Sequence, residues 1–142
     1  MKVTVTFSLV FILLSISSTL SIAQETLEYQ LAIIDAGKFL PKNHFTVTLF
    51  RSLLEDLSYT YVEDGQQIAD MTVKSRQVLK EKGIYESLLK MMEGMNALFS
   101  KKIENQQYAE YIAAYMTLRM DGHSHTDAVL GLDAILEEFG VY

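Results

Sequence analysis

Residues 45–61 read FTVTLFRSLLEDLSYTY, and this stretch decides the fold class. Its large apolar residues recur three or four positions apart, at Phe50, Leu53, Leu54, Leu57 and Tyr61. That spacing places them on one face of an α-helix. Residues 44–49, HFTVTL, alternate with the two-residue period of a strand, but they run directly into the helical pattern. We therefore interpret them as the beginning of a helix over 45–61.

The same helical period continues on both sides of this stretch. Further helices are predicted over about 25–39, 65–82, 84–102, 105–120 and 125–139. The connections are short, which favours antiparallel neighbours. The sequence therefore predicts an all-α fold, a compact bundle of about six short-to-medium antiparallel helices. A repeat of helical hairpins is not indicated, because no second copy of the last two segments appears at a matching period.

Residues between the apolar stretches are typical of helix ends. Pro41 interrupts the helical pattern after the first segment. Asp64 is a suitable N-cap for the third helix, and Gly83 a suitable residue just after its end. Gly122 ends the fifth helix, and Ser124 or Thr126 caps the sixth. These helices are expected to bury Leu27, Leu31, Ile34, Ala128, Val129, Leu132, Ile135, Leu136 and Phe139.

The first 23 residues resemble a signal peptide. Lys2 precedes an apolar run over 3–14, and Ser21 and Ala23 are the small residues that signal peptidase requires. The alternative is an uncleaved anchor, but the run is shorter than the roughly 20 apolar residues that span a bilayer. We predict a signal peptide over 1–23, one helical domain over 24–142, and a periplasmic or secreted protein.

Composition excludes several classes of function. The chain has no cysteine, so it offers no thiol nucleophile and no cysteine-ligated zinc. Its net charge is −6, and removing Lys2 with the signal makes the remainder more negative. Nucleic acids and anionic membranes favour basic proteins. We therefore expect neither as a partner and predict that the partner is another protein.

Two histidines lie in the densest group of potential metal ligands, residues 121–127, DGHSHTD. Imidazole and carboxylate groups bind divalent transition metals, so His123 and His125 indicate a possible metal site. The simpler interpretation is a helix junction, with Gly122 ending one helix and Ser124 beginning the next. We favour the junction and predict no metal and no cofactor.

Methionines are numerous, and Met91, Met92 and Met95 continue an apolar stripe. Core packing explains them. The alternatives are an adaptable binding groove or a thioether site for Cu(I).

A stripe of tyrosines is the candidate interaction face. Tyr108, Tyr111 and Tyr115 share one side of the fifth helix, and we expect them to border a groove containing Met116 or Met120. Tyrosine is favoured where one end of a side chain is apolar and the other wet, as in binding sites for proteins, peptides or sugars. The alternative is the edge of an ordinary core.

No group of residues indicates catalysis. Adjacent acids such as Glu55 and Asp56 point apart on a helix, whereas glycosidases need two carboxylates facing each other. The G-x-S-x-G motif of serine hydrolases is absent. The sequence therefore favours a non-enzymatic accessory, adaptor or inhibitor protein. The alternative is a small-ligand or metal-binding module that uses the tyrosine stripe or the loop of His123 and His125.

Overall fold

The computed structural model describes residues 25–99 and 104–140. The predicted signal peptide over 1–23 lies outside these residues, as do Lys101 and Lys102, which we expected in the last turn of the fourth helix.

The described residues form six α-helices, so the predicted all-α fold is confirmed. They are α1 (Leu27–Ala36), α2 (Phe45–Thr60), α3 (Gly65–Glu81), α4 (Leu88–Ala97), α5 (Tyr108–Met120) and α6 (His125–Glu138). Within the same residues the only β-type pairing is an isolated bridge between Tyr61 and Gln106.

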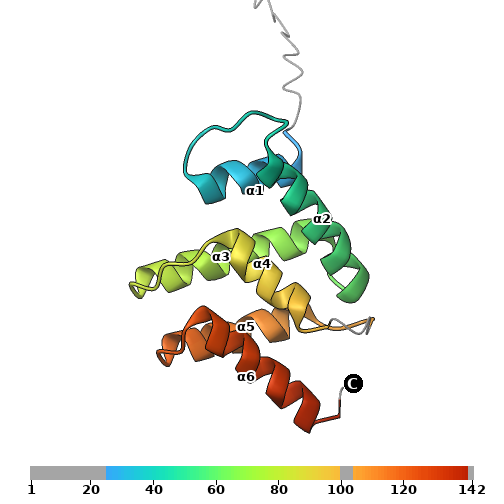
Figure 1. Cartoon of the computed structure of the whole chain (residues 1–142), viewed down its shortest axis with the longest axis vertical. Helices are drawn as coiled ribbons and strands as arrows, with labels where there is room; N and C mark the ends of the chain where they lie inside the picture. Colours follow the sequence, from blue (N-terminus) through green and yellow to red (C-terminus); the bar gives the residue numbers. More distant parts are fainter. Residues whose placement is uncertain (1–24, 100–103, 141–142) are drawn as a thin grey trace, which may run out of the picture.

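The helices form three successive hairpins, α1 with α2, α3 with α4, and α5 with α6 (Figure 1). Helices α1, α3 and α5 pack against one another in that order, and α2, α4 and α6 do the same. Each hairpin therefore buries its apolar face against the next, as in stacked helical hairpins generally.

The core is apolar and continuous through all three hairpins. Met91, Met92 and Met95 are each 0% exposed, so core packing accounts for these methionines. The same core contains other large side chains with less than 2% exposure, including Phe50, Leu57, Ile68 and Leu88.

Several predicted helix ends are confirmed. Asp64 begins α3 in a capping box, where its carboxylate accepts from the Gln67 N–H at 2.8 Å. Ser124 begins α6 and accepts from the Asp127 N–H at 3.1 Å. Gly83 and Gly122 have φ angles of 76° and 96°, which favour glycine after a helix.

The predicted start of α4 was wrong. The helix begins at Leu88 rather than Ile84, because Ser87 caps it and accepts from the Lys90 N–H at 3.1 Å. Asp35 of α1 also accepts from the Leu88 N–H, at 2.6 Å. This carboxylate from another hairpin supplies a favourable negative charge at the helix N-terminus.

The start of α5 and both ends of α1 also differ from prediction. Helix α5 begins at Tyr108 rather than Asn105, which has a φ of 63° and cannot continue a right-handed helix. The Glu63 carboxylate accepts from the Tyr108 N–H at 2.8 Å. Helix α1 covers Leu27–Ala36 rather than 25–39, because Gly37 takes a left-handed φ of 64°.

Three residues that we predicted to face the core are exposed. Ile34 is 42% exposed, Ile135 44% and Phe139 79%. Ile34 lies on the side of α1 that borders a groove described below. Ile135 and Phe139 lie at the C-terminal end of α6, where no other described helix covers them.

None of the helices in the described part of the chain is long and apolar enough to cross a membrane.

Candidate functional site

Two of the three tyrosines of the predicted interaction face are buried, and the third is half-buried. Tyr108 and Tyr115 are both 0% exposed, so a partner cannot reach their rings in this conformation. Tyr111 is half-buried, and its hydroxyl donates to the Gln106 side chain at 2.9 Å. The buried hydroxyl of Tyr108 lies 2.6 Å from the Thr72 hydroxyl.

The two methionines of the predicted face are more accessible. Met116 is half-buried and Met120 is 44% exposed. The residues of this face that a partner could contact are therefore Tyr111, Met116 and Met120.

The two histidines of residues 121–127 have different surroundings. His123 is exposed, whereas His125 is the first residue of α6 and its Nδ1 lies 2.8 Å from the Tyr115 hydroxyl. The segment is a helix junction capped by Ser124. Over residues 25–99 and 104–140, no group of three or more histidines and carboxylates is arranged to hold a metal ion.

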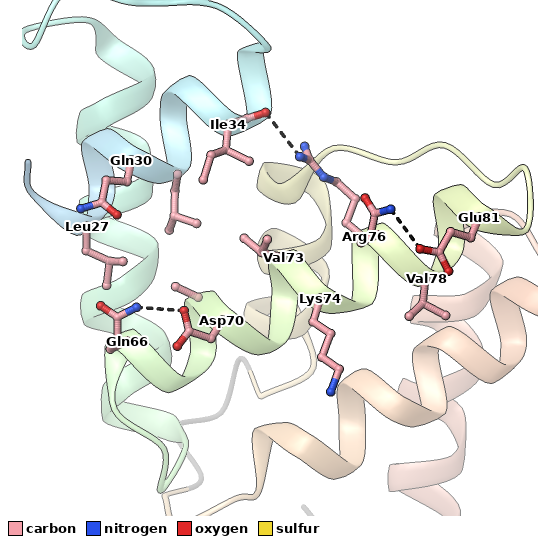
Figure 2. Close-up of a pocket in the computed structure, with 13 residues that line it drawn as sticks. Leu27, Gln30, Ile34, Gln66, Asp70, Val73, Lys74, Arg76, Val78 and Glu81 are labelled. Carbon is pink, nitrogen blue, oxygen red and sulfur yellow. Dashed lines mark hydrogen bonds between the residues drawn. The ribbon is translucent and has the colours of Figure 1, made fainter.

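A surface groove of about 600 Å³ lies between α1 and α3, and we call it the α1–α3 groove (Figure 2). Leu27, Leu31 and Ile34 of α1 recur at helical spacing along one wall. The α3 wall has the same period, at Gln66, Asp70, Val73, Gln77 and Glu81. Apolar side chains from both helices form much of the surface, including Leu27, Leu31, Ile34, Ala69, Val73 and Val78.

Polar side chains line the α3 side of the α1–α3 groove. Asp70 accepts a hydrogen bond from Gln66 at 2.9 Å, and Glu81 accepts one from Gln77 at 3.0 Å (Figure 2). Lys74 lies between these two acids along the helix. Negative, positive and negative charges therefore follow one another beside the apolar surface.

A smaller polar pocket of about 270 Å³ adjoins the groove and shares Ile34, Arg76 and Gln77 with it. Arg76 forms an ion pair with Asp35 at 3.1 Å and also donates to the Ile34 carbonyl at 3.3 Å. Lys80, Tyr85 and Glu86 complete the lining.

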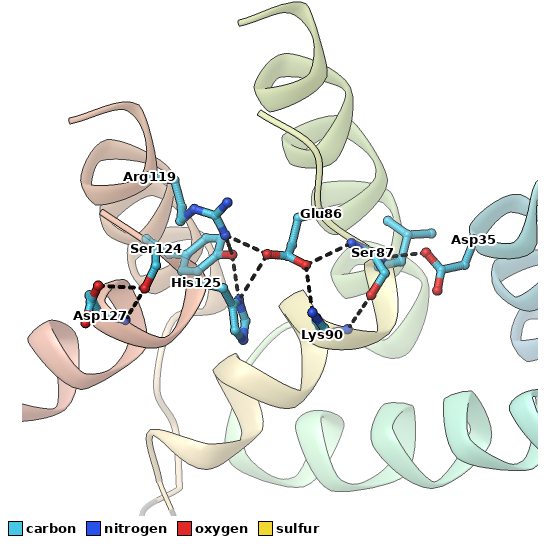
Figure 3. A network of polar contacts seen from close by, with 10 residues as sticks. Asp35, Glu86, Ser87, Lys90, Arg119, Ser124, His125 and Asp127 are labelled. Carbon is cyan, nitrogen blue, oxygen red and sulfur yellow. Dashed lines mark hydrogen bonds and ion pairs between the residues drawn. The ribbon is translucent and has the colours of Figure 1, made fainter. Parts of the chain in front are cut away.

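Glu86 also takes part in a buried polar network between the second and third hairpins (Figure 3). Arg119 Nη1 donates to Glu86 Oε2 at 2.7 Å and to the Tyr115 hydroxyl at 3.0 Å. His125 Nδ1 lies 3.8 Å from Glu86 Oε2. The Glu86 and Arg119 side chains are each 9% exposed. We call these four residues the Glu86–Arg119 network.

The network favours the charged forms of its ion pair. Burial alone would raise the pKa of Glu86, but hydrogen bonds from Arg119 and the Ser87 N–H hold this pKa below its usual value. Burial lowers the pKa of Arg119, but the hydrogen bonds to Glu86 and Tyr115 and the charges of these two groups together raise it above its usual value. Burial raises the pKa of Tyr115 to about 12 and lowers the pKa of His125.

Among the pockets lined by described residues, Glu86 and His125 border different ones. Glu86 borders the polar pocket, whereas His125 borders a separate groove of about 250 Å³ beside Gly94 and Val129. General acid–base catalysis needs its groups within reach of one substrate. The arrangement is better suited to holding two hairpins together than to proton transfer on a ligand.

Sequence reasoning missed both the α1–α3 groove and the network. One signal for the network was present, since Arg119 lies on the same stripe of α5 as Tyr108, Ile112 and Tyr115. A charged residue on a buried stripe requires a charged or hydrogen-bonding partner. Nothing local identifies that partner as Glu86, which is 33 residues away.

Fold and site together define a protein of stacked helical hairpins with an apolar surface groove. The MoxZ family model matches residues 38–135, which is more than half of the chain, so the chain belongs to the MoxZ family. The match includes α2 to α5 and most of α6, and it begins after α1. No curated protein and no solved structure matches.

Proposed function

We propose that this MoxZ-family chain is an exported, non-enzymatic protein that binds another protein through the α1–α3 groove. The observation that carries the proposal is the exposed apolar surface of that groove, to which Ile34 contributes with 42% of its surface exposed. Covering such surface removes it from water at a gain of roughly 25 cal/mol per Å². Exposed apolar patches rimmed by polar residues are typical of interaction sites.

The chemistry of the groove favours an amphipathic helix as the occupant. The apolar side chains of α1, together with Val73 of α3, offer a surface that suits the apolar stripe of a third helix. The charges of Asp70, Lys74 and Glu81 would then face flanking residues of opposite sign on that helix. These charges are at the rim, so they select a partner more than they strengthen its binding.

Site-specific cross-linking tests the proposal. A photo-reactive phenylalanine analogue replaces Ile34 in the groove, or Leu130 on α6 as a control that is 60% exposed. Irradiation in the producing cells, followed by mass spectrometry, should identify one protein attached through a helical segment at position 34 but not at position 130. Equal labelling at both positions, or attachment only to a second copy of the chain, would contradict the proposal.

Binding should then depend on the groove. Once the partner is identified, Ile34→Glu should weaken its affinity by at least about tenfold, the scale of a 1.4 kcal/mol loss. Leu130→Glu places the same charge on another helix and should leave the affinity unchanged. Raising the salt concentration should have little effect, because the contact is mainly apolar.

Export is a separate part of the proposal. The intact mass of the protein recovered outside the cytoplasm should correspond to a chain that begins at Gln24. A form that keeps residues 3–14 and fractionates with membranes would show that the segment is an anchor.

A further inference from the structure

The direction of two hydrogen bonds can be assigned within the Glu86–Arg119 network. A guanidinium group only donates, so the Tyr115 oxygen accepts from Arg119 Nη1 at 3.0 Å. The tyrosine hydroxyl hydrogen is then available for His125 Nδ1 at 2.8 Å. Both hydrogen bonds and the hydroxyl hydrogen are satisfied together when His125 Nδ1 is the acceptor, and in that arrangement the hydrogen of the neutral ring is on Nε2.

The Cε1–Nε2 edge of the His125 ring faces helix α4. A Cβ atom added at Gly94 would lie 3.1 Å from His125 Cε1 and 3.6 Å from His125 Nε2. The ring thus contacts α5 through Tyr115 and α4 at Gly94. Together with Val129, it is a side chain of α6 that joins the third hairpin to the second.

We propose that His125 is a pH-sensitive latch, whose protonation loosens α6 from α4 and α5. A proton on Nδ1 turns this atom from an acceptor into a donor. The new N–H group then points at the Tyr115 oxygen, which already accepts from Arg119. The hydrogen of the Tyr115 hydroxyl loses its acceptor at the same time. The buried hydrogen-bond chain of Figure 3 must therefore rearrange.

Charges around His125 do not compensate for this rearrangement. Glu86, from the segment before α4, and Glu93 of α4 favour the protonated ring, whereas Arg119 of α5 and Lys90 of α4 oppose it. Burial also opposes it and is the largest cause of the lowered pKa of His125. The carboxylate of Glu86 is already bound to Arg119 at 2.7 Å.

The direction of the pH effect follows from this. The folded protein holds the proton on His125 less tightly than the unfolded chain does, whose histidine has the ordinary pKa of 6.5. The contribution of neutral His125 to stability is therefore complete above about pH 6.5 and is lost as the pH falls below it. This consequence rests on the export proposed above: an exported protein is exposed to the pH of its surroundings, and acidification would then loosen α6 from α4 and α5.

Nuclear magnetic resonance of the protein purified after expression of the full-length chain tests the latch directly. The ¹⁵N shifts at pH 7.5 should show an unprotonated Nδ1 in His125, and its titration midpoint should lie below 6.5. Tyr115→Phe removes the competing hydroxyl hydrogen and should move this midpoint upward. A neutral ring protonated at Nδ1, or a wild-type midpoint at or above 6.5, would overturn the proposal.

Hydrogen exchange and urea unfolding provide the second measurement. When the pH is lowered from 7.5 to 5.5, amide protection against hydrogen exchange in the wild type should fall more in α6 than in α2. Over the same pH change, the unfolding equilibrium constant of the wild type should rise at least about threefold more than that of His125→Gln. His123→Gln is the matched control, because His123 is exposed in the same junction, and it should behave like the wild type. The same pH response in His125→Gln and the wild type would refute the latch.

Discussion

The α1–α3 groove and the Glu86–Arg119 network both lie where one helical hairpin packs on the next, yet they use different chemistry. At the groove, α1 leaves Ile34 42% exposed beside a row of polar α3 side chains. At the network, the facing groups are charged but buried, and Gly94 brings α4 so close to α6 that a Cβ would lie 2.8 Å from Val129 Cγ2.

The difference separates an apolar surface that lacks a partner from a buried ion pair whose two members already bind each other. Among the buried polar side-chain atoms of the described residues, only Arg119 Nε is left without a hydrogen bond. Apolar surface in the groove is still in contact with water, so covering it releases free energy. In the network, each charged group already has its partner, and disturbing either one leaves a buried charge alone. We therefore expect substitutions at the network to act on folding, and substitutions in the groove to act on binding.

The largest effect is expected when the buried ion pair is broken. Arg119→Leu removes the cation and leaves Glu86 buried without its 2.7 Å partner. Loss of one member of a buried pair costs about 3–5 kcal/mol. Urea unfolding at pH 7.5 measures this loss, and the double variant Arg119→Leu with Glu86→Leu should recover part of it.

Lys90→Ala is the control for this prediction. Its ammonium group lies 3.8 Å from Glu86 Oε1, but the side chain is 63% exposed. Exposed pairs of this kind contribute only about 0–1 kcal/mol. A loss for Lys90→Ala as large as that for Arg119→Leu would mean that burial does not distinguish the two pairs.

A medium effect is expected from filling the close approach of α4 to α6. The new methyl group in Gly94→Ala would meet Val129 Cγ2 at 2.8 Å and His125 Cε1 at 3.1 Å. Such overpacking costs about 1–3 kcal/mol, which exceeds the roughly 1 kcal/mol that alanine gains over glycine in a helix. Thermal unfolding should therefore show net destabilisation.

Gly131→Ala on α6 is the matched control. Its added Cβ would be 3.7 Å from Leu118 Cδ1, which is ordinary contact distance. Only the helix preference of alanine remains, so this variant should be more stable than the wild type by up to about 1 kcal/mol. If both variants were stabilised, the approach at Gly94 would be looser than the structure shows.

Acid unfolding should reveal a smaller difference, between the buried network and the more exposed Glu28–Arg51 ion pair of α1 with α2. Glu86 and Glu28 both have a pKa below the usual value, so each contributes stability that is present above about pH 4.5 and is lost as the pH falls through its folded pKa. The Arg51 partner of Glu28 is 53% exposed, whereas that of Glu86 is 9% exposed. Between about pH 5 and pH 3, the free energy of unfolding should therefore depend less on pH in Glu86→Gln than in Glu28→Gln. An equal reduction of the pH dependence in the two variants would contradict the expected difference between the buried and the exposed ion pair.

Sequence alone predicts the parts of this molecule that depend on local interactions. The six helices follow from their apolar period, and the ends at Asp64, Gly83 and Gly122 follow from caps and turns a few residues away. The start of α4 could not be predicted in this way. Asp35, which accepts from the Leu88 N–H, lies 53 residues earlier in the chain.

The site depends on contacts that no local pattern encodes. A tyrosine stripe looks the same whether it faces a partner or a neighbouring helix, and in α5 the packing of α3 and α6 buries Tyr108 and Tyr115. Ile34 belongs to the same apolar period as Leu31, yet Leu31 is 2% exposed and Ile34 42%. The packing of α1 against α2, α3 and α4 buries Leu31 and leaves Ile34 exposed at the groove.

The smallest effect on folding is expected inside the groove, and it gives the sharpest test of the comparison. Ile34→Ser removes an apolar side chain that is already 42% exposed, so the free energy of unfolding should change by less than about 1 kcal/mol. Ile33→Ser is the matched control on the same helix, because Ile33 packs against the core. It should cost more, about 1–3 kcal/mol. Both values come from urea unfolding at pH 7.5. An equal loss of unfolding free energy in the two variants would mean that Ile34 is a core residue and that the α1–α3 groove is part of the ordinary packing between helices. A loss confined to Ile33→Ser would leave Ile34 as apolar surface that folding does not need, which is the property a docking site requires.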